Sequence, residues 1–167
     1  IEEGAGDLLM ARQALLGFAQ TLPYDSLGPD KVRYALRTQQ FYSFLDTASL
    51  CQFVWGPSWE LFGPQETVDF VKAVTGWEDF DLEELLEIGE RRINLMRAFN
   101  AREGLDRRDD KLPAKFFRPL TGTGPTRGVA LDHAVIEGAL DEYYRLAGWD
   151  ATTGNPTPDT LARLGLA

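Results

Sequence analysis

The stretch DLEELLEIGERRINLMRAFNAREG, residues 81–104, decides the fold class of this chain. Its apolar positions step by three and four, the spacing that places side chains on one face of an α-helix; they are Leu82, Leu85, Leu86, Gly89, Ile93, Met96 and Phe99. Glycine at position 89 within that face predicts the close approach of a neighbouring helix. Asp81 followed by Glu84 is typical of a helix start, and Gly104 of a helix end. We therefore expect a helix from Leu82 to about Arg102.

The rest of the chain carries further helix boundaries of the same kind. Prolines and glycines bound predicted helices at 7–22, 29–45, 64–75, 131–147 and 161–166. For the last of these, Thr157-Pro158-Asp159 is typical of an N-cap, a first-turn proline and an acidic second position. No segment shows the sustained period-two alternation that is typical of strands. Residues 105–128 form one predicted long loop, a kind of segment that usually covers a site or contacts a partner. The fold class is therefore all-α, a compact globule of about five to seven helices that forms one domain over residues 1–167.

Composition excludes several classes of partner. Lys and Arg number 17 against 26 Asp and Glu, a formal net charge of −9, which argues against nucleic acid or an anionic membrane. No window approaches the ~20 apolar residues of a membrane span. The single cysteine cannot form an internal disulfide, which favours a cytoplasmic location. The opening at Ile1, without a methionine, suggests a piece of a longer chain.

The stretch FYSFLDTASLCQF, residues 41–53, holds the candidate chemistry. Asp46 follows a largely apolar helix, and Cys51, the only cysteine, comes shortly after it. A thiolate is a strong metal ligand, and a carboxylate sheltered from water needs hydrogen-bond donors, so two such side chains facing one cavity would suit a cofactor. The simpler alternative is a small core residue at Cys51 and a solvated helix end at Asp46. One ligand cannot define a metal site by itself.

Other candidate sites are weaker. His133 is the only histidine, so it has no second histidine with which to hold zinc, and a surface or capping role is expected. The glycine-rich TGTGPTRG, residues 121–128, lacks the Gly-Lys-Ser/Thr ending of a phosphate loop and is better interpreted as flexible. Asn94 and Asn100 are expected to bind the loop after their helix. No Ser-His-Asp, Cys-His or multi-histidine set can be assembled, so no catalytic residue is assigned within this chain.

Several motifs, taken in order, resemble one known family. They are the run Gly89–Gly104, then Asp109-Asp110-Lys111-Leu112-Pro113, Glu142-Tyr143-Tyr144, Gly148-Trp149-Asp150 and the ending PTPDTLARLGL. Together they look like the C-terminal region of the tungsten-containing aldehyde ferredoxin oxidoreductases, and the resemblance spans essentially the whole chain. It implies that residues 1–167 form the C-terminal helical domain of a longer protein.

In that family a D-x-x-G-L-C segment contacts the pterin cofactor and supplies the last cysteine of a [4Fe-4S] cluster, and the corresponding segment here runs from Asp46 to Cys51. The resemblance implies that Asp46 accepts hydrogen bonds from the pterin amino group, that the backbone at Leu50 contacts the pterin, and that Cys51 ligates iron. Ser49 stands at the cofactor-contacting position where the family pattern has glycine. A positive φ there would strain serine or shift the pterin.

The function that the resemblance implies is oxidation of an aldehyde to a carboxylic acid, with ferredoxin as the electron acceptor. The full-length protein would hold a tungsto- or molybdo-bispterin and the [4Fe-4S] cluster. This piece is expected to bind neither alone and to be inactive without the upstream domains of the same chain. Two alternatives remain open: a stand-alone helical interaction module that lost the redox role, and a small subunit that completes a site on a separate larger chain.

Overall fold

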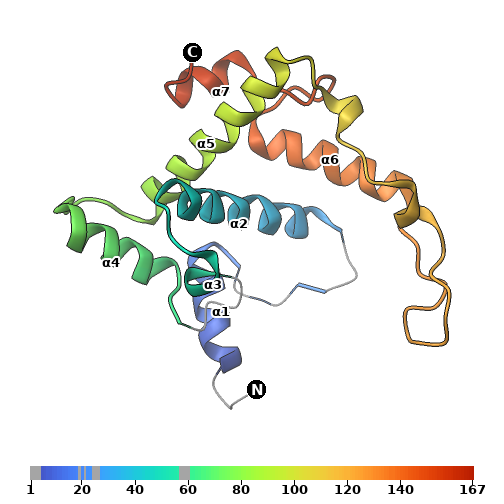
Figure 1. The fold of residues 1–167 in the computed structure, drawn as a ribbon, viewed down its shortest axis with the longest axis horizontal. Coiled ribbons are helices and arrows are strands. Elements are labelled where there is room, and N and C mark those ends of the chain that lie inside the picture. The colour runs from blue at the N-terminus through green and yellow to red at the C-terminus, as the bar shows by residue number, and fades with distance from the viewer. Residues whose placement is uncertain (1–4, 19, 21, 24–26, 57–60) are drawn as a thin grey trace.

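The computed structural model describes residues 5–18, 20, 22–23, 27–56 and 61–167 (Figure 1). Over these residues it contains seven α-helices, two short 3-10 helices and no strand, which confirms the all-α fold class. The α-helices are α1 (Ala5–Leu15), α2 (Pro29–Thr47), α3 (Gln52–Trp55), α4 (Pro64–Thr75), α5 (Leu82–Arg102), α6 (His133–Ala147) and α7 (Pro158–Arg163), and the 3-10 helices span Arg107–Asp109 and Ala114–Phe117. No described helix has both the length and the apolar character that crossing a membrane requires.

The pair formed by α2 and α5 is the centre of the fold (Figure 1). Gly89 allows their close approach, because a Cβ at that position would lie 1.9 Å from the backbone oxygen of Gln40. No real contact is that short, so only glycine fits unless the two helices separate. The close approach predicted at Gly89 is therefore confirmed, and α6 packs against the same helix α2.

The hydrophobic core lies mainly between the C-terminal half of α2 and the N-terminal half of α5. Its buried side chains come from these helices and from neighbouring segments; they are Leu16, Phe18, Phe41, Phe44, Leu45, Val68, Phe80, Leu85 and Leu86. The rings of Phe44 and Phe80 pack with centroids 5.9 Å apart. Each such burial contributes about 1.5–3 kcal/mol, so the core fixes the end of α2, where Asp46 lies.

The helix boundaries follow local chemistry. Asp81 accepts a hydrogen bond from the Glu84 N–H at 2.9 Å and begins α5. Gly76 ends α4 and Gly148 ends α6, each in the left-handed conformation that glycine adopts without strain. The predicted boundaries of α2, α4 and α5 are confirmed to within two residues.

Some predictions differ from the structure. α1 ends at Leu15 rather than near residue 22, because Gly17 adopts a positive φ of 92°. α6 begins two residues later than predicted. The predicted N-cap Thr157 and first-turn Pro158 of α7 are confirmed, but this helix ends at Arg163 rather than at Leu166. Met96 and Phe99, expected on the inner face of α5, are 51% and 59% exposed. The apolar stripe of α5 therefore extends beyond the core and leaves large apolar side chains on the surface.

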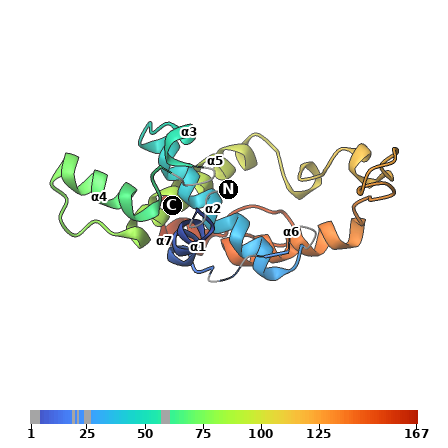
Figure 2. The same cartoon turned by 90° about the horizontal axis from the view of Figure 1, so that it is seen from below.

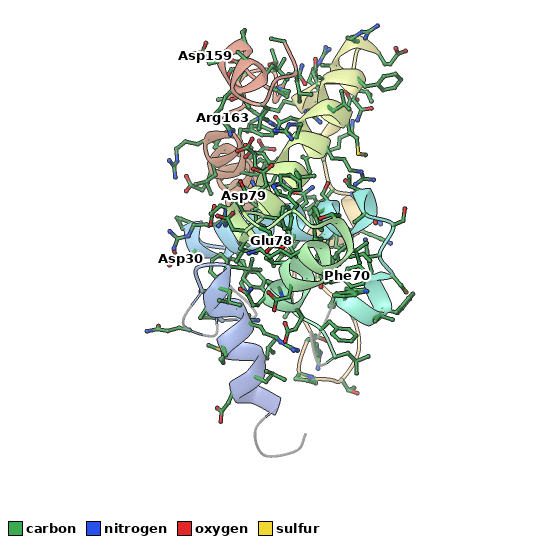
Figure 3. The ribbon with its side chains drawn as sticks, turned by 90° about the vertical axis from the view of Figure 1, so that its left-hand side faces the viewer. Asp30, Phe70, Glu78, Asp79, Asp159 and Arg163 are labelled. Carbon is green, nitrogen blue, oxygen red and sulfur yellow. The ribbon has the colours of Figure 1, made fainter. Side chains whose placement is uncertain are left out.

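The segment between α5 and α6 contains no α-helix or strand and holds only the two 3-10 helices, as expected for a long loop. Figures 1 and 2 show it extending past the N-terminal end of α6, away from α4. Figure 3 looks onto a different face, which carries α4, α7 and the connection between α4 and α5, with Glu78 and Asp79 near its centre.

Candidate cofactor-binding site

A closed turn joins α2 to α3 and carries the candidate residues. The N–H of Ser49 donates to the Asp46 carbonyl at 3.2 Å, and the N–H of Leu50 donates to the Leu45 carbonyl at 2.9 Å. These two bonds form a Schellman motif, in which the residue after the C-cap adopts the left-handed conformation. That residue is Ser49, with a φ of 56°, the only non-glycine residue with positive φ in the described part of the chain. The end of α2 thus fixes the backbone that leads to Cys51.

This motif accounts for the spacing of the pattern. Glycine is the usual residue at the left-handed position, and an apolar residue commonly follows it and contacts the last helical turn. Leu50 follows Ser49 and packs, partly buried, against the hydrophobic core. Serine therefore occupies a position whose geometry favours glycine. Because its φ is positive, the backbone strain predicted for serine at this position is present.

Replacing Ser49 with glycine is expected to stabilise this turn by up to about 1 kcal/mol. The left-handed conformation costs a residue with a Cβ roughly 1–2 kcal/mol, and part of that gain is lost to the freedom of glycine in the unfolded chain. Hydrogen exchange at the Leu50 amide should slow by roughly fivefold. Ala48→Gly is the matched control, because Ala48 has a φ of −82° and gains nothing from glycine. Equal effects of the two substitutions would contradict strain at Ser49.

Asp46 is exposed in the last turn of α2, and both of its oxygens have partners. Oδ1 accepts a hydrogen bond from Gln52 Nε2 at 2.7 Å, and Oδ2 forms an ion pair with Arg92 Nη1 at 3.1 Å. Arg92 also donates to the Ser43 hydroxyl at 3.3 Å. A carboxylate offers about four lone-pair sites, so about two remain for a ligand. Gln52 and Arg92 therefore orient the carboxylate without saturating it.

Sequence reasoning missed both Gln52 and Arg92. Arg92 lies on the other side of the sequence gap between α2 and α5, and only the packing of α5 on α2 brings it to Asp46. Gln52 directly follows Cys51 and has a long amide side chain. This was the one feature of the sequence that could have indicated a hydrogen bond back to Asp46.

A cavity of about 330 Å³ adjoins the Asp46 carboxylate between α2 and α5. It is lined by Gln39, Tyr42, Ser43, Asp46, Arg92, Ile93, Met96, Arg97, Asn100 and Trp149. Ser49, Leu50 and Cys51 do not line it. The turn therefore links Asp46 and Cys51, and of the two only Asp46 lies at this cavity.

Cys51 is a free, exposed cysteine that immediately precedes α3. Its backbone carbonyl accepts hydrogen bonds from the N–H groups of Val54 and Trp55, each at 3.0 Å, which begin α3 and fix the position of Cys51. In the described residues no three His, Cys, Asp or Glu side chains are close enough together to hold a metal ion. Cys51 is therefore not part of a metal site that these residues could form by themselves.

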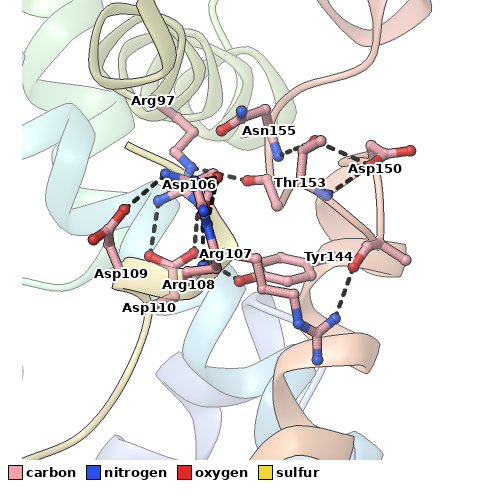
Figure 4. Close-up of polar contacts among 12 residues, drawn as sticks. Arg97, Asp106, Arg107, Arg108, Asp109, Asp110, Tyr144, Asp150, Thr153 and Asn155 are labelled. Atoms are coloured by element: carbon pink, nitrogen blue, oxygen red, sulfur yellow. Dashed lines mark hydrogen bonds and ion pairs between the residues drawn. The ribbon is translucent and has the colours of Figure 1, made fainter. Parts of the chain in front are cut away.

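A network of charged side chains borders the same cavity at Arg97 (Figure 4). Arg97 makes a two-point ion pair with Asp110, with Nη1–Oδ1 at 2.8 Å and Nη2–Oδ2 at 2.5 Å. Its Nε donates to the Gly154 carbonyl at 2.8 Å, and the Tyr144 hydroxyl donates to Asp110 Oδ2 at 2.6 Å. The guanidinium also lies 5.2 Å from the centroid of the Trp149 ring. The network ties the end of α5 to the following loop and to α6.

Two tyrosines at this network have perturbed pKa values. Burial raises the pKa of Tyr143 to about 12, and its hydroxyl donates to Gln39 Oε1 at 2.6 Å. Burial, followed by the hydrogen bond to Asp110, raises the pKa of Tyr144. Both phenols are therefore protonated at neutral pH, and they serve here as hydrogen-bond donors.

The loop after α5 is held differently from the prediction. Asn94 accepts a hydrogen bond from Trp149 Nε1 at 2.8 Å, so it binds the segment after α6 instead. Among the described residues, Asn100 bonds to the loop through its backbone carbonyl and not through its side chain. From α5, the side chain that holds the loop is Arg97, through Asp110; the loop's own Arg107 pairs with Glu137 and Asp141 of α6.

The remaining sequence candidates lie on the surface. His133 is exposed at the first residue of α6, and its ring stacks on Phe117 with centroids 3.6 Å apart. This confirms the surface position expected for the histidine. The glycine-rich residues 121–128 are exposed throughout.

Comparison with known proteins gives a consistent result. Residues 7–166 match the family model described as "Aldehyde ferredoxin oxidoreductase, domains 2 & 3". The chain is 34% identical to the tungsten-containing aldehyde ferredoxin oxidoreductase of Pyrococcus furiosus, covering 95% of this chain and 25% of that protein. It is 32% identical to the protein of the same name from Pyrococcus horikoshii, covering 94% and 24% respectively. The chain thus spans about a quarter of the length of these relatives.

A solved structure supports the fold. It is described as the active site complex BamBC of benzoyl coenzyme A reductase in complex with 1,5-dienoyl-CoA, and it aligns with a TM-score of 0.67 over 95% of this chain and 25% of that chain. The identity of 24% limits this likeness to the fold. The family model covers nearly the whole chain, and from that match we conclude that the chain belongs to the aldehyde ferredoxin oxidoreductase family.

Proposed function

We propose that this chain is the C-terminal helical domain of a tungsten or molybdenum pterin aldehyde:ferredoxin oxidoreductase, and that it contributes one wall of the pterin site and one ligand of a [4Fe-4S] cluster. The Schellman turn is the observation that carries this proposal. It sets Asp46 and Cys51 at the two ends of one hydrogen-bonded segment, and both side chains are exposed on this chain. An exposed carboxylate beside a cavity and an exposed thiol suit ligands that come from outside the chain.

At the pterin wall, Asp46 accepts hydrogen bonds from pterin N–H groups. Gln52 and Arg92 hold the carboxylate in place for this contact. The Leu50 N–H is already used within the turn, so the carbonyl oxygen of Leu50 is the backbone group left for the pterin. The left-handed conformation of Ser49 sets the path of the backbone that presents that carbonyl.

Cys51 is the residue that would ligate iron, because it is the only cysteine of the chain. A [4Fe-4S] cluster takes four cysteine thiolates, so the other three belong to the rest of the protein. When bound, the pterin metal supplies the aldehyde chemistry and the cluster conducts electrons onward to ferredoxin. The residues of this chain bind and orient these groups, and no general acid or base is assigned among them.

The upstream domains of the same polypeptide are the first partner in this proposal. Large apolar side chains are exposed in α3, at positions 61 and 62, and on α5; they are Phe53, Leu61, Phe62, Leu95, Met96 and Phe99. Phe53, two residues after the cysteine, is 93% exposed. Exposed apolar side chains of this size are typical of interaction surfaces, so we infer that the upstream domains cover α3 and the outer face of α5. Ferredoxin, the aldehyde substrate and a cytoplasmic location belong to the same proposal.

A second candidate function is a helical interaction module, or a small subunit that completes a site on a larger chain. The observation that favours it is Ser49, which keeps the turn but strains it where the family pattern has glycine. A chain released from cofactor binding could tolerate this strain, because the turn would then serve only to join two helices.

Asp46→Asn in the full-length protein tests the pterin role. The substitution keeps the shape of the side chain but replaces one acceptor oxygen with a donor, so pterin content and aldehyde-dependent dye reduction should fall by about 10- to 100-fold while cluster iron is retained. Asp30→Asn is the matched control, since Asp30 lies in the first turn of the same helix and also pairs with an arginine, at 2.9 Å. Asp30→Asn should leave both quantities unchanged.

Two outcomes would count against the proposal. Unchanged pterin content and dye reduction in Asp46→Asn would remove Asp46 from the pterin site. The interaction module would be favoured if the full-length protein, produced in cells supplied with tungsten, molybdenum and iron, contained neither pterin nor iron.

A further inference from the structure

An apolar groove of about 550 Å³ lies between α2, α6 and the loop that follows α5. Figures 1 and 2 show that α2 and α6 lie side by side. The volume falls within the range of small-molecule sites, which is about 300–1,000 Å³. The groove shares Gln39, Arg97 and Trp149 with the cavity at Asp46. The groove and that cavity therefore adjoin each other at these three side chains.

The walls of the groove are mainly apolar. They include Val32 from α2, Ile136 and Leu140 from α6, and Leu112 from the loop. Leu27 also lines the groove, and both Leu27 and Leu112 are exposed, so the groove is open to solvent on this chain. Walls of this kind suit the hydrocarbon body of a ligand.

Several polar side chains of the walls are engaged with one another. The Tyr143 hydroxyl donates to Gln39 Oε1, and the Tyr144 hydroxyl donates to Asp110 Oδ2, each at 2.6 Å. Asp110 also receives the two-point ion pair of Arg97. The charges of Arg97 and Asp110 offset each other, so this pair adds no net charge to the groove.

Two further cations at the groove have no such partner. Lys31 lines it from α2 and Lys111 from the loop. Neither lysine forms an ion pair with any other residue that the structure describes. The carboxylates that directly precede them in the chain, Asp30 and Asp110, are each paired with an arginine. Three cations and one carboxylate thus line the groove, a formal balance of 3 − 1 = +2 in a chain whose formal net charge is −9.

Solvation alone would account for lysines that are scattered over the surface. The chain has four lysines, at positions 31, 72, 111 and 115. Two of them, from elements far apart in the sequence, line the same apolar groove. A pocket with apolar walls and a small number of charged groups is typical of a site for a ligand that has an apolar body and a charged end. The sign of the charge here makes that end an anion.

We propose that this groove binds a carboxylate with an apolar body, and that Lys31 and Lys111 supply the positive charge that holds the carboxylate. An ammonium group has three N–H donors for carboxylate oxygens. The origin of the ligand rests on the proposed function, because oxidation of an aldehyde yields a carboxylic acid, which is ionised at neutral pH. The ligand is then the product, received from the adjoining cavity at Asp46, and the substrates are aldehydes with an aromatic or aliphatic body.

Calorimetric titration of the full-length protein with 3-phenylpropionate at low salt tests the proposal. The matched ligand is 3-phenylpropanamide, which has nearly the same shape without the charge, and it should bind more weakly by about threefold or more. Acetate keeps the charge but lacks the apolar body, so it should bind more weakly by about tenfold or more.

Substitution of the lysines identifies the groove as the place of binding. Lys31→Gln and Lys111→Gln should each weaken the binding of 3-phenylpropionate by about threefold and leave that of 3-phenylpropanamide unchanged. Lys115→Gln is the matched control. It removes the same charge from the same loop, but Lys115 does not line the groove, so affinity should change by less than about twofold.

Equal affinities for the acid and the amide would overturn the proposal. So would the absence of binding, or affinities for the acid that Lys31→Gln and Lys111→Gln leave unchanged. The pterin and iron contents of the same preparations report separately on the proposed function. A protein that contains pterin and iron but does not bind 3-phenylpropionate overturns the groove proposal alone. A protein that lacks both but binds the acid through these lysines supports the groove and counts against the proposed function.

Discussion

The proposed function predicts that full-length protein carrying Cys51→Ala loses most of the [4Fe-4S] iron and more than about 100-fold of the aldehyde-dependent dye reduction. Changing a group that only orients a metal ligand already costs 10- to 100-fold, and loss of the ligand itself costs more. The fold should survive, because the cysteine side chain is exposed and its backbone carbonyl, which begins α3, is kept by alanine. Colorimetric iron and the electron paramagnetic resonance signal of the reduced cluster measure the first effect.

Thr47→Ala is the control for this substitution. Thr47 lies in the last turn of α2 and is exposed, and its hydroxyl donates to the Ser43 carbonyl at 2.9 Å. Loss of the Thr47 hydroxyl changes the end of α2 without removing a thiol. Iron content and dye reduction should therefore stay within about twofold of the unsubstituted protein. A Cys51→Ala protein with intact cluster and activity would refute the ligand role, and with it the central step of the proposed function.

Helix positions were the part of the fold most open to prediction. Asp81 and Gly76 fix helix ends through hydrogen bonds to residues within four positions, so the local sequence is enough to predict these helix ends. The close approach at Gly89 was also predictable, because a glycine inside an apolar stripe costs helix stability and is kept where a side chain would not fit.

The burial of each helix face was less predictable, because it depends on which elements lie opposite. The stripe of α5 continues to Met96 and Phe99, but the core beneath it ends earlier, so these two side chains are exposed. Helical spacing indicates which residues share a face. It cannot indicate where along that face the neighbouring helices stop.

The candidate site likewise has a part that the sequence predicts and a part that only the structure shows. Asp46 and Cys51 were found by residue type and by resemblance, and the structure adds the turn that joins them. Ser49 concealed this turn, since glycine is the signal by which a Schellman motif is usually recognised. Arg92 lies far from Asp46 in the sequence, and only the packing of α5 against α2 makes it a partner of that carboxylate.

The Arg97–Asp110 pair shows most clearly what long-range packing adds. The side chains of Arg97 and Asp110 are 11% and 25% exposed, and their two-point contact joins α5 to the loop that follows it. The nearby pair of Arg108 with Asp106 has an arginine side chain that is 86% exposed. Water screens the second pair but much less the first, so the two pairs should differ widely in energy.

Asp110→Ala is accordingly expected to lower the local stability of α5 and α6 by about 3–5 kcal/mol, because it leaves the guanidinium of Arg97 buried without its partner. Native-state hydrogen exchange of the α5 and α6 amides in the full-length protein measures this loss, which corresponds to exchange faster by more than about 100-fold. Arg108→Ala, which breaks the exposed pair, should change the exchange of these amides far less than Asp110→Ala does, because water screens that pair. The double variant Arg97→Leu/Asp110→Ala should be less destabilised than Asp110→Ala alone, since it removes the unpaired charge together with its partner. A double variant that loses as much stability as the two single substitutions combined would show instead that each side chain acts through its own packing.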